Sequence, residues 1–393
     1  MVVMIELQNI IQHAYKNSDD FRNRMIAANI EPRDIEARED LCKLPVLKKE
    51  DLPTLQKEFS PFGGMTTMEA SKMVRIFMSP GPIYDPQSIE GDNWRFSEAL
   101  EAANFNENDI VQNTFSYHLS PAGFMFDGAL RRLGATVIPA GTGNTELQIQ
   151  VMKDLGVTGY VGTPSFLTIL LDAAEEKGWN VGDELKLSKA FFTAEMVTAE
   201  MKQRCDKLNI CAYEGYGTAD CGLIAYQDKQ GPGLKLTETA LVQLCDPLTG
   251  QELPQDEDGG EGEVVVTVFD EIYPLIRFGT GDLSRWVKGF EGQRLEGVLG
   301  RVSDGVKVKG MFVREKQLTN TIQELGFQTY QAIISRENNQ DQIEIMIETA
   351  ELISDQIVAK IKDIIRVTPI VKVLPKGSLK PDSKKLIDTR KWN

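Results

Sequence analysis

Histidine and cysteine are scarce in this sequence. It has only two histidines, His13 and His118, and five cysteines, an odd number without a CxxC pair. Two histidines leave little material for a histidine-rich metal centre or a Ser-His triad. The cysteines suggest neither a disulfide framework nor a thiolate zinc site. This usage fits a reducing compartment, and we expect a cytoplasmic protein.

Basic residues are also in short supply. Forty-three lysines and arginines stand against 58 acidic residues, a net charge of -15. Nucleic acid and anionic membranes both demand a basic face, so neither is expected as a partner. The first residues, MVVMIELQNIIQHAYKN, show helical periodicity and an early Glu6 instead of a signal peptide, and no apolar run approaches membrane-spanning length. An acidic balance does not exclude a nucleotide, which needs only a local site.

The pattern of elements predicts an α/β fold with two parts. Residues 1–60 form a helical lead-in, and over 61–225 short apolar strands alternate with helices. Such alternation predicts mixed or parallel sheets flanked by helices. Strands separated by turn clusters predict a β-rich subdomain over 226–300, which completes a large N-terminal body, residues 1–300. Two strand pairs and two helices predict a small α+β C-terminal domain over 301–393.

Two polar residues follow glycines in turns. Asp282 lies in Thr280-Gly281-Asp282-Leu283, after an apolar run, and Arg301 follows Gly300. A carboxylate on a tight turn at a strand end can accept both hydroxyls of a ribose. An arginine can hold phosphate or ribose oxygens as a fork. Both patterns are also common in ordinary turns, so these residues alone leave a structural turn and a nucleotide site open.

Taken together, six segments resemble the adenylate-forming enzymes, most closely the phenylacetate–coenzyme A ligase family. In chain order they are GALRRLGATVIPAGTGNTELQIQVMKDLGVTGYVGTPSF, FTAEM, YEGYGTADCG, LIRFGTGDLSRW, GRVSDGVKVKG and GSLKPDSKKLIDTRKW. Each motif is weak alone, but the ordered set spans almost the whole chain. The resemblance implies that ATP activates an aryl or small organic acid to an acyl-adenylate, with Mg²⁺, and that coenzyme A then takes the acyl group. It also implies that the small C-terminal domain is a mobile lid, which rotates about residues 301–304.

The resemblance assigns roles to the matched residues. Asp282 would take the ribose hydroxyls, Arg301 would contact ribose or phosphate, and Asp220 would bind magnesium. The residues implied for the nucleotide are Ser79, Gly81, Glu195, Tyr216, Gly217, Thr218, Asp282 and Arg301. Tyr216 would pack on the adenine; without the resemblance, a packed aromatic and a helix-starting acid would account for Tyr216 and Glu195.

The acid pocket is expected from the loop over residues 115–126. Its candidate residues are Tyr117, His118 and Ser120. His118 is either a polar contact for the substrate or an ordinary loop histidine. The sequence does not select one acid.

The chain departs from the family at the phosphate loop. The matching stretch, FMSPGPIYDP over residues 77–86, contains no lysine, its prolines lack N–H donors, and Asp85 adds a repelling charge. Asp220 stands where the family usually has a glutamate. Two alternatives therefore stay open: a catalytically degenerate relative that binds nucleotide or acyl-adenylate as a sensor or partner subunit, and adenylation with an acceptor other than coenzyme A.

The terminal segment should hold the family's catalytic lysine. Lys384 is the first candidate, and Lys385 or Lys380 is the second; an ordinary basic tail is the alternative for each. A homodimer is compatible with this interpretation.

Overall fold

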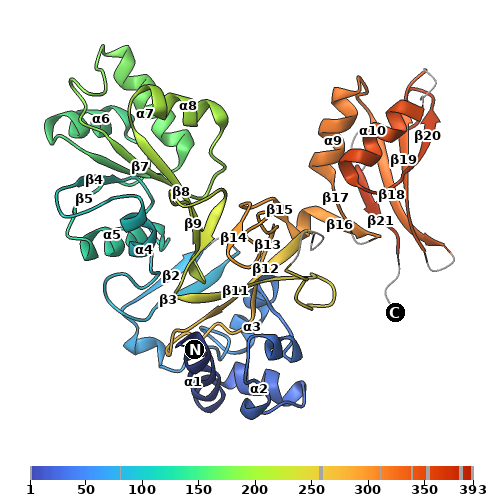
Figure 1. The fold of residues 1–393 in the computed structure, drawn as a ribbon, viewed down its shortest axis with the longest axis horizontal. Helices are drawn as coiled ribbons and strands as arrows, with labels where there is room; N and C mark the ends of the chain where they lie inside the picture. The colour runs from blue at the N-terminus through green and yellow to red at the C-terminus, as the bar shows by residue number, and fades with distance from the viewer. Residues whose placement is uncertain are drawn as a thin grey trace. The chain divides into compact units, whose positions relative to one another are not determined.

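The structure is a computed structural model that describes residues 2–79, 81–255, 260–309, 311–337, 340–350, 355–379 and 384–390. It divides into two compact units, Met1–Leu299 and Gly300–Asn393 (Figure 1). No helix in the described ranges is long and apolar enough to cross a membrane.

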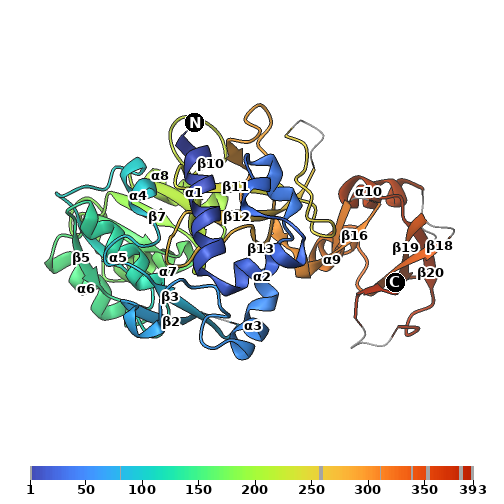
Figure 2. The same ribbon diagram turned by 90° about the horizontal axis from the view of Figure 1, so that it is seen from below.

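The chain begins with helices that are anchored to a later strand. Helices α1 (Val2–Asn17) and α2 (Asp19–Ala27) pack around a buried core that also holds Leu241 and Ile276. After the short helices η1 (Pro32–Asp34) and η2 (Glu39–Lys43), strand β1 (Leu47–Lys48) pairs in parallel with β13 (Phe278–Ser284). Helices η3 (Lys49–Asp51) and α3 (Leu52–Glu58) follow, and then η4 (Ala70–Lys72). The lead-in is therefore part of the first unit's core (Figure 2).

An eight-stranded sheet forms the centre of the first unit, in the order β14-β10-β9-β8-β7-β6-β4-β5. The neighbouring strands β5, β4, β6, β7 and β8 run parallel to one another. The sheet continues with β9, β10 and β14, each antiparallel to the strand before it. The bounds are β4 (Ile110–Asn113), β5 (Thr136–Pro139), β6 (Gly159–Gly162), β7 (Lys189–Phe192), β8 (Cys211–Thr218), β9 (Gly222–Tyr226), β10 (Leu234–Leu236) and β14 (Arg294–Leu295).

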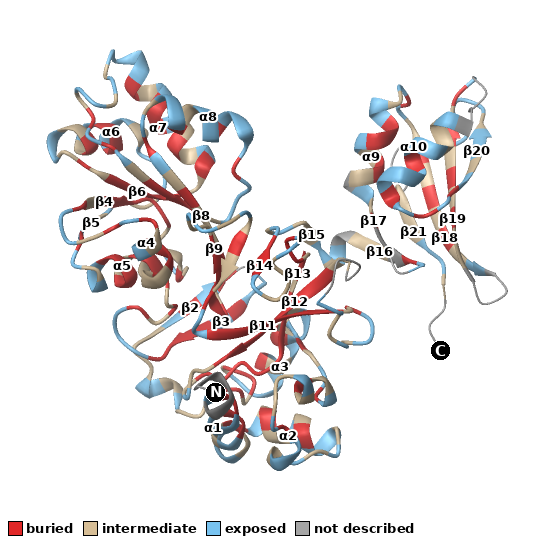
Figure 3. Ribbon diagram, viewed as in Figure 1, coloured by how far each residue is buried: buried red, intermediate tan, exposed pale blue. Residues whose placement is uncertain are grey.

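Helices cover both faces of this sheet, which explains why its central strands are apolar on both sides. Phe191 packs in one core with α4 (Ser97–Ala102) and α5 (Ala122–Arg132). Its neighbour Phe192 packs in a second core on the other face. That core is formed by α6 (Thr145–Asp154), α7 (Pro164–Glu176) and α8 (Ala199–Lys207). The predicted α/β class, with a mixed sheet between helices, is confirmed (Figure 3).

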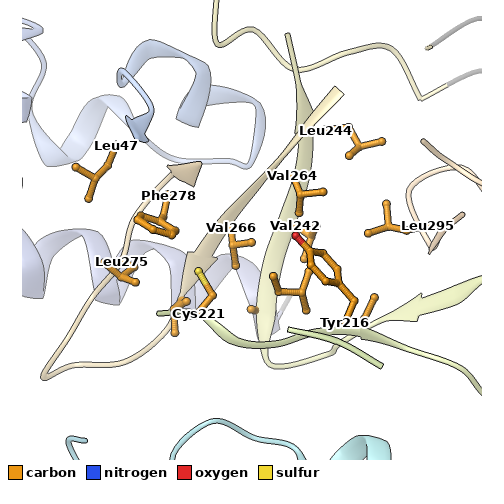
Figure 4. Packing of buried hydrophobic residues seen from close by; sticks show 14 of the residues in the cluster. Leu47, Tyr216, Cys221, Val242, Leu244, Val264, Val266, Leu275, Phe278 and Leu295 are labelled. Atoms are coloured by element: carbon orange, nitrogen blue, oxygen red, sulfur yellow. The ribbon is translucent and has the colours of Figure 1, made fainter. Parts of the chain in front are cut away.

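A second sheet places β11 (Ala240–Cys245) beside β12 (Gly262–Val268), and β12 beside β13. Valine side chains of β11 and β12 pack in one buried cluster with Phe278, Cys221 and Tyr216 (Figure 4). A separate hairpin joins β2 (Arg75–Ser79) to β3 (Ile83–Gln87), with Ser79 paired to Ile83. Packing against the second sheet thus fixes the segment that carries Tyr216.

The second unit is a small α+β domain. It opens with β15 (Gly300–Arg301), η5 (Val302–Asp304) and the hairpin β16 (Gly305–Val308) to β17 (Met311–Arg314). A four-stranded sheet then has the order β20-β19-β18-β21. Its strands are β18 (Tyr330–Glu337), β19 (Gln340–Glu348), β20 (Ile370–Leu374) and β21 (Leu386–Asp388), and its helices are α9 (Glu315–Glu324) and α10 (Asp355–Ile365). Isoleucines from both helices and from the sheet share one core.

Candidate functional site

Two predicted site residues from different sheets meet directly. The hydroxyl of Tyr216, on β8, donates to Oδ2 of Asp282, on β13, over 3.0 Å, and it lies 3.3 Å from Oγ1 of Thr280. Burial, together with the charge of Asp282, raises the pKa of Tyr216 well above its ordinary value. The phenol therefore keeps its proton and serves as a donor. The ring of Tyr216 lies within the buried cluster of Figure 4. The packing of this ring on adenine stays a prediction.

Asp282 lies within strand β13 and not in the predicted turn at a strand end, but the strand still needs a glycine just before it. Gly281 has a φ of +75°, which side-chain-bearing residues rarely adopt. Its N–H donates to Oε1 of Glu263 over 3.0 Å, and the N–H of Asp282 donates to Thr280 Oγ1 over 3.1 Å. Thr280 Oγ1 itself donates to the carbonyl of Val264 over 2.9 Å. These hydrogen bonds thus fix the backbone that carries Asp282, and Tyr216 holds its carboxylate.

The loop that follows Tyr216 is clamped from a distant segment. The indole N–H of Trp94 donates to the carbonyl of Ala219 over 2.9 Å, and the Arg95 guanidinium donates to the carbonyl of Cys221. Within the loop, the N–H of Cys221 donates to Oγ1 of Thr218 over 3.1 Å. At Gly217 there is no room for a side chain, since an added Cβ would lie 2.5 Å from the Gly222 oxygen. Gly217 and Thr218 therefore shape the backbone that carries Asp220.

Asp220, the predicted magnesium ligand, has a lysine as its partner. Nζ of Lys49 lies 2.6 Å from Asp220 Oδ2, and the Asp220 side chain has no exposed surface. Its other oxygen, Oδ1, is buried without a hydrogen-bond partner in the described part of the chain. Burial acts to lower the pKa of Lys49, but the attraction of Asp220 outweighs it and the pKa is raised. The lysine is therefore a charged, half-buried group.

A second carboxylate, Asp85 on β3, lies within electrostatic range of the same pair. Both of its oxygens are buried, and Ser79 is the hydrogen-bonding group that acts on them. Burial and the charge of Asp220 raise the pKa of Asp85 to about 7, against the partial compensation of hydrogen bonding from Ser79 and of the charge of Lys49. Asp85, Asp220 and Lys49 thus form a largely buried cluster, in which the ammonium group bonded to Asp220 also attracts Asp85.

The stretch that corresponds to the phosphate loop is the β2–β3 hairpin. Ser79 is buried, and hydrogen bonding from its side chain acts on Asp85. Gly81 has a φ of +143°, and Pro80 lies outside the described residues. The N–H of Met78 donates to the carbonyl of Leu119 over 2.9 Å, which ties the hairpin to the predicted acid-pocket loop. The roles of Ser79 and Gly81 toward phosphate stay predictions.

Glu195 lies at the carboxyl end of the parallel strands, where α/β proteins bind ligands. It is exposed in the loop after β7, and its Oε2 accepts the N–H of Ser165, in the first turn of α7, over 3.3 Å. Glu195 therefore acts as an acidic residue at a helix N-terminus, as the structural alternative proposed, but the helix is α7 and not α8, which follows it in the chain. The carboxylate retains exposed surface for a ligand.

The loop predicted to form the acid pocket is held by Tyr117. Its hydroxyl accepts from Asn113 Nδ2 over 2.8 Å and donates to Asp127 Oδ2 over 3.2 Å. Ser120 Oγ accepts the N–H of Ala122 at the start of α5, and His118 is exposed. Tyr117 and Ser120 therefore have local structural partners, and all three pocket roles stay predictions.

The remaining candidates lie in the second unit. Arg301 is exposed on β15. Lys384 is exposed, and its carbonyl accepts from Gln331 Nε2 over 3.0 Å. Nζ of Lys385 lies 5.8 Å from the centre of the Tyr330 ring, a cation–π contact, whereas Lys380 lies outside the described residues. Of these lysines, Lys384 is more exposed than Lys385.

The sequence profile of the AMP-binding enzyme family matches residues 97–267, and that of the AMP-binding enzyme C-terminal domain matches residues 315–390. The chain belongs to the AMP-binding enzyme family. Among curated relatives of this AMP-binding protein, a phenylacetate-coenzyme A ligase of Pseudomonas putida is 29% identical, over 86% of this chain and 79% of the relative. A phenylacetate-coenzyme A ligase of Thermus thermophilus is 26% identical, over 94% of this chain and 91% of the relative.

Solved structures agree on the fold. An open conformation of 2-hydroxyisobutyryl-CoA ligase, in complex with 2-HIB-AMP and CoA, superposes with a TM-score of 0.83 at 20% identity, covering 98% of this chain and 90% of that chain. The same ligase in its postadenylation state with 2-HIB-AMP gives a TM-score of 0.71 at 20% identity, covering 99% of this chain and 89% of that chain. The fold of the AMP-binding protein is therefore that of an adenylate-forming ligase.

Magnesium does not fit Asp220 as its ligand here. Mg²⁺ demands oxygen ligands at near-ideal octahedral geometry and keeps several waters. Lys49 already holds Oδ2, and the side chain has no exposed surface at which waters could gather. Among the residues that the structure describes, no three His, Cys, Asp or Glu side chains form a group that could hold a metal ion.

Sequence reasoning missed Lys49, Trp94 and Arg95. Lys49 lies in LPVLKKEDLP, where a lysine before a short helix is unremarkable, and it is 171 residues from Asp220. Only the three-dimensional pairing of β1 with β13 distinguishes it from Lys48.

Proposed function

We propose that this protein is an AMP-forming acid–coenzyme A ligase of the phenylacetate–coenzyme A ligase type. It uses ATP to convert an aryl or small organic acid to an acyl-adenylate and transfers the acyl group to coenzyme A. The observation that carries this proposal is the hydrogen-bonded pair of Tyr216 and Asp282, which sets a carboxylate in the family's ribose-binding motif. The curated relatives support a ligase and not the degenerate alternative.

In the first half-reaction, a carboxylate oxygen of the acid attacks the α-phosphorus of ATP, and pyrophosphate leaves. Asp282 would hold the ribose hydroxyls, while Glu195 and the backbone at Gly217 and Thr218 would border the adenine. Such positioning lowers the entropic part of the barrier. Negative charge grows on the α-phosphate oxygens, and a lysine at that point would stabilise it. We assign this role to Lys384.

In the second half-reaction, the sulfur of coenzyme A attacks the acyl carbon, and AMP leaves. We infer that the C-terminal unit rotates about residues 301–304 between the two steps, a hinge-type change, and that Arg301 contacts ribose or phosphate in one of its positions. Tyr117, His118 and Ser120 would line the acid pocket. A cytoplasmic location and a homodimer belong to the same proposal.

The test is ATP–pyrophosphate exchange on the purified protein across a panel of aryl and small acids. The expected result is exchange that depends on one class of acid, with a thioester product when coenzyme A is added. Asp282→Ala should weaken AMP binding by calorimetry, whereas Asp109→Ala, which removes a different buried carboxylate paired with Lys189, should leave AMP binding unchanged. AMP binding without exchange for any acid would instead favour the sensor alternative.

A further inference from the structure

The proposed reaction steps give no role to the cluster of Lys49, Asp85 and Asp220. Lys49 is the first residue of η3, directly after β1. Leu47 of β1 pairs with Phe278, and its N–H donates to the Arg277 carbonyl over 2.9 Å. The backbone at Lys49 is therefore fixed beside β13, the strand that carries Asp282.

We propose that Lys49 is the resident counter-ion of Asp220, and that its ammonium group, rather than a magnesium ion, occupies the cation position beside this carboxylate. This inference rests on the proposed ligase function, because Asp220 was predicted to bind magnesium from the resemblance to that family. The metal would then reach the active site on the phosphates of ATP, and Asp220 would not be its ligand.

The contact distance supports this assignment. At 2.6 Å, Lys49 Nζ makes a charge-assisted hydrogen bond with Oδ2 of Asp220. A cation bound to the same oxygen would meet the ammonium group at close range and be repelled. The repulsion is not relieved by solvent, because the Asp220 side chain is fully buried and that of Lys49 is only 22% exposed.

Because Asp85 is a second buried carboxylate, the positive charge of Lys49 determines whether this cluster has a counter-ion. The oxygens of Asp85 and Oδ1 of Asp220 are buried. Ser79 acts as a hydrogen-bond donor toward Asp85, whereas Oδ1 of Asp220 has no partner among the described residues. Tyr273 also has a buried hydroxyl without a partner in the described ranges, and burial, together with the charges of Asp220 and Asp85, raises its pKa. With Lys49 present, the cluster holds one positive charge. Without it, the two buried carboxylates of Asp85 and Asp220 would be left without this counter-ion, and carboxylate oxygens are ligands that hard cations take.

The experiment is a Mn²⁺ titration of the full chain, without nucleotide, followed by electron paramagnetic resonance. We expect the wild type and Asp220→Asn to bind Mn²⁺ equally weakly. Lys49→Ala, which removes the ammonium group and leaves space, should bind Mn²⁺ at least about tenfold more tightly than the wild type. Asp220→Asn in the Lys49→Ala background should abolish this gain, and Lys49→Arg should show none.

Lys48→Ala is the matched control, because Lys48 is the adjacent lysine with a half-exposed side chain and an exposed partner, Glu50. It should titrate like the wild type. Tighter Mn²⁺ binding by the wild type than by Asp220→Asn would overturn the proposal, and so would a folded Lys49→Ala without the gain. If Lys49→Ala does not fold, the comparison of the wild type with Asp220→Asn decides alone. The titration contains no substrate, so a failure of the ligase proposal would appear only in the exchange assay.

Discussion

The Tyr216 hydroxyl donates a 3.0 Å hydrogen bond to Oδ2 of Asp282 and thereby joins the eight-stranded sheet to the second sheet of the first unit. Both residues are almost fully buried. A hydrogen bond to a charged group in such surroundings is stronger than one at the surface. Tyr216 therefore orients the carboxylate of Asp282, which we assign to the ribose. This role does not depend on what the Tyr216 ring contacts when a nucleotide is bound.

Removing this hydroxyl should destabilise the protein. Tyr216→Phe keeps the packed ring but leaves Asp282 without this donor, so we expect the free energy of unfolding to fall by about 1.5–3 kcal/mol. Urea denaturation measures the change. Tyr273→Phe is the control, because that buried hydroxyl has no hydrogen bond in the described ranges and its loss should be neutral or stabilising. Equal losses in the two variants would contradict the role of the Tyr216 hydroxyl.

Asp85 should make stability depend on pH. Its pKa is raised from 3.8 to about 7 by burial and by Asp220. The folded state thus binds the proton more tightly than the unfolded chain, so this group's contribution to stability falls as the pH rises from 3.8 to about 7 and is constant above. Each unit of pKa difference corresponds to about 1.4 kcal/mol.

Asp85→Asn should therefore remove part of that pH dependence and be more stable than the wild type at pH values above the shifted pKa. Unfolding curves over the pH series measure both effects. Glu50→Gln, at a side chain that is 73% exposed, should leave the pH profile of the wild type unchanged. A profile for Asp85→Asn that matches the wild type at every pH would refute the assignment.

Among the terminal lysines, Lys384→Ala should lower the rate of ATP–pyrophosphate exchange by about 10²–10³-fold, the effect of losing one stabilising group at a developing charge. Lys385→Ala should have a mild effect, because that side chain lies against Tyr330. Lys380→Ala completes the series, and thermal unfolding checks that each variant folds. Similar mild effects at all three positions would rule out a catalytic lysine in this segment.

Gly217→Ala should disturb the loop that carries Asp220. An added Cβ would lie 2.5 Å from the Gly222 oxygen and 2.7 Å from the Phe96 ring, so we expect a loss of stability together with weaker AMP binding. Gly143→Ala is the control: its φ of +76° gives backbone strain, but no atom lies within 4 Å of the new Cβ. Only the first variant should change AMP affinity in calorimetry.

The sequence predicted the fold class well because strand and helix periodicity are local. Phe191 and Phe192 are adjacent apolar residues, and a strand buried on both faces explains the pair without knowledge of the rest of the chain. The ordered motifs also identified Tyr216 and Asp282, which the structure brings into contact. What they form with a nucleotide stays a prediction.

The partner of Asp220 could not be predicted, since ion pairs between distant segments depend on tertiary packing. Lys48 and Lys49 are equivalent by composition, and one residue of register in β1 decides which of them reaches the core. The phosphate-loop departure was visible in the sequence, but the buried state of Asp85 on a paired strand was not.

The pairing of β1 with β13 has a consequence for biosynthesis. Leu47 and Lys48 leave the ribosome long before their partners Phe278 and Gly279 are translated. The nascent N-terminal segment must therefore wait without Leu241 and Ile276, which complete its core, and during that time it is more open to chaperones and proteases. Stalled or truncated chains that end before β13 should accordingly be cleared quickly by the cell, even when their central helices and strands are already made.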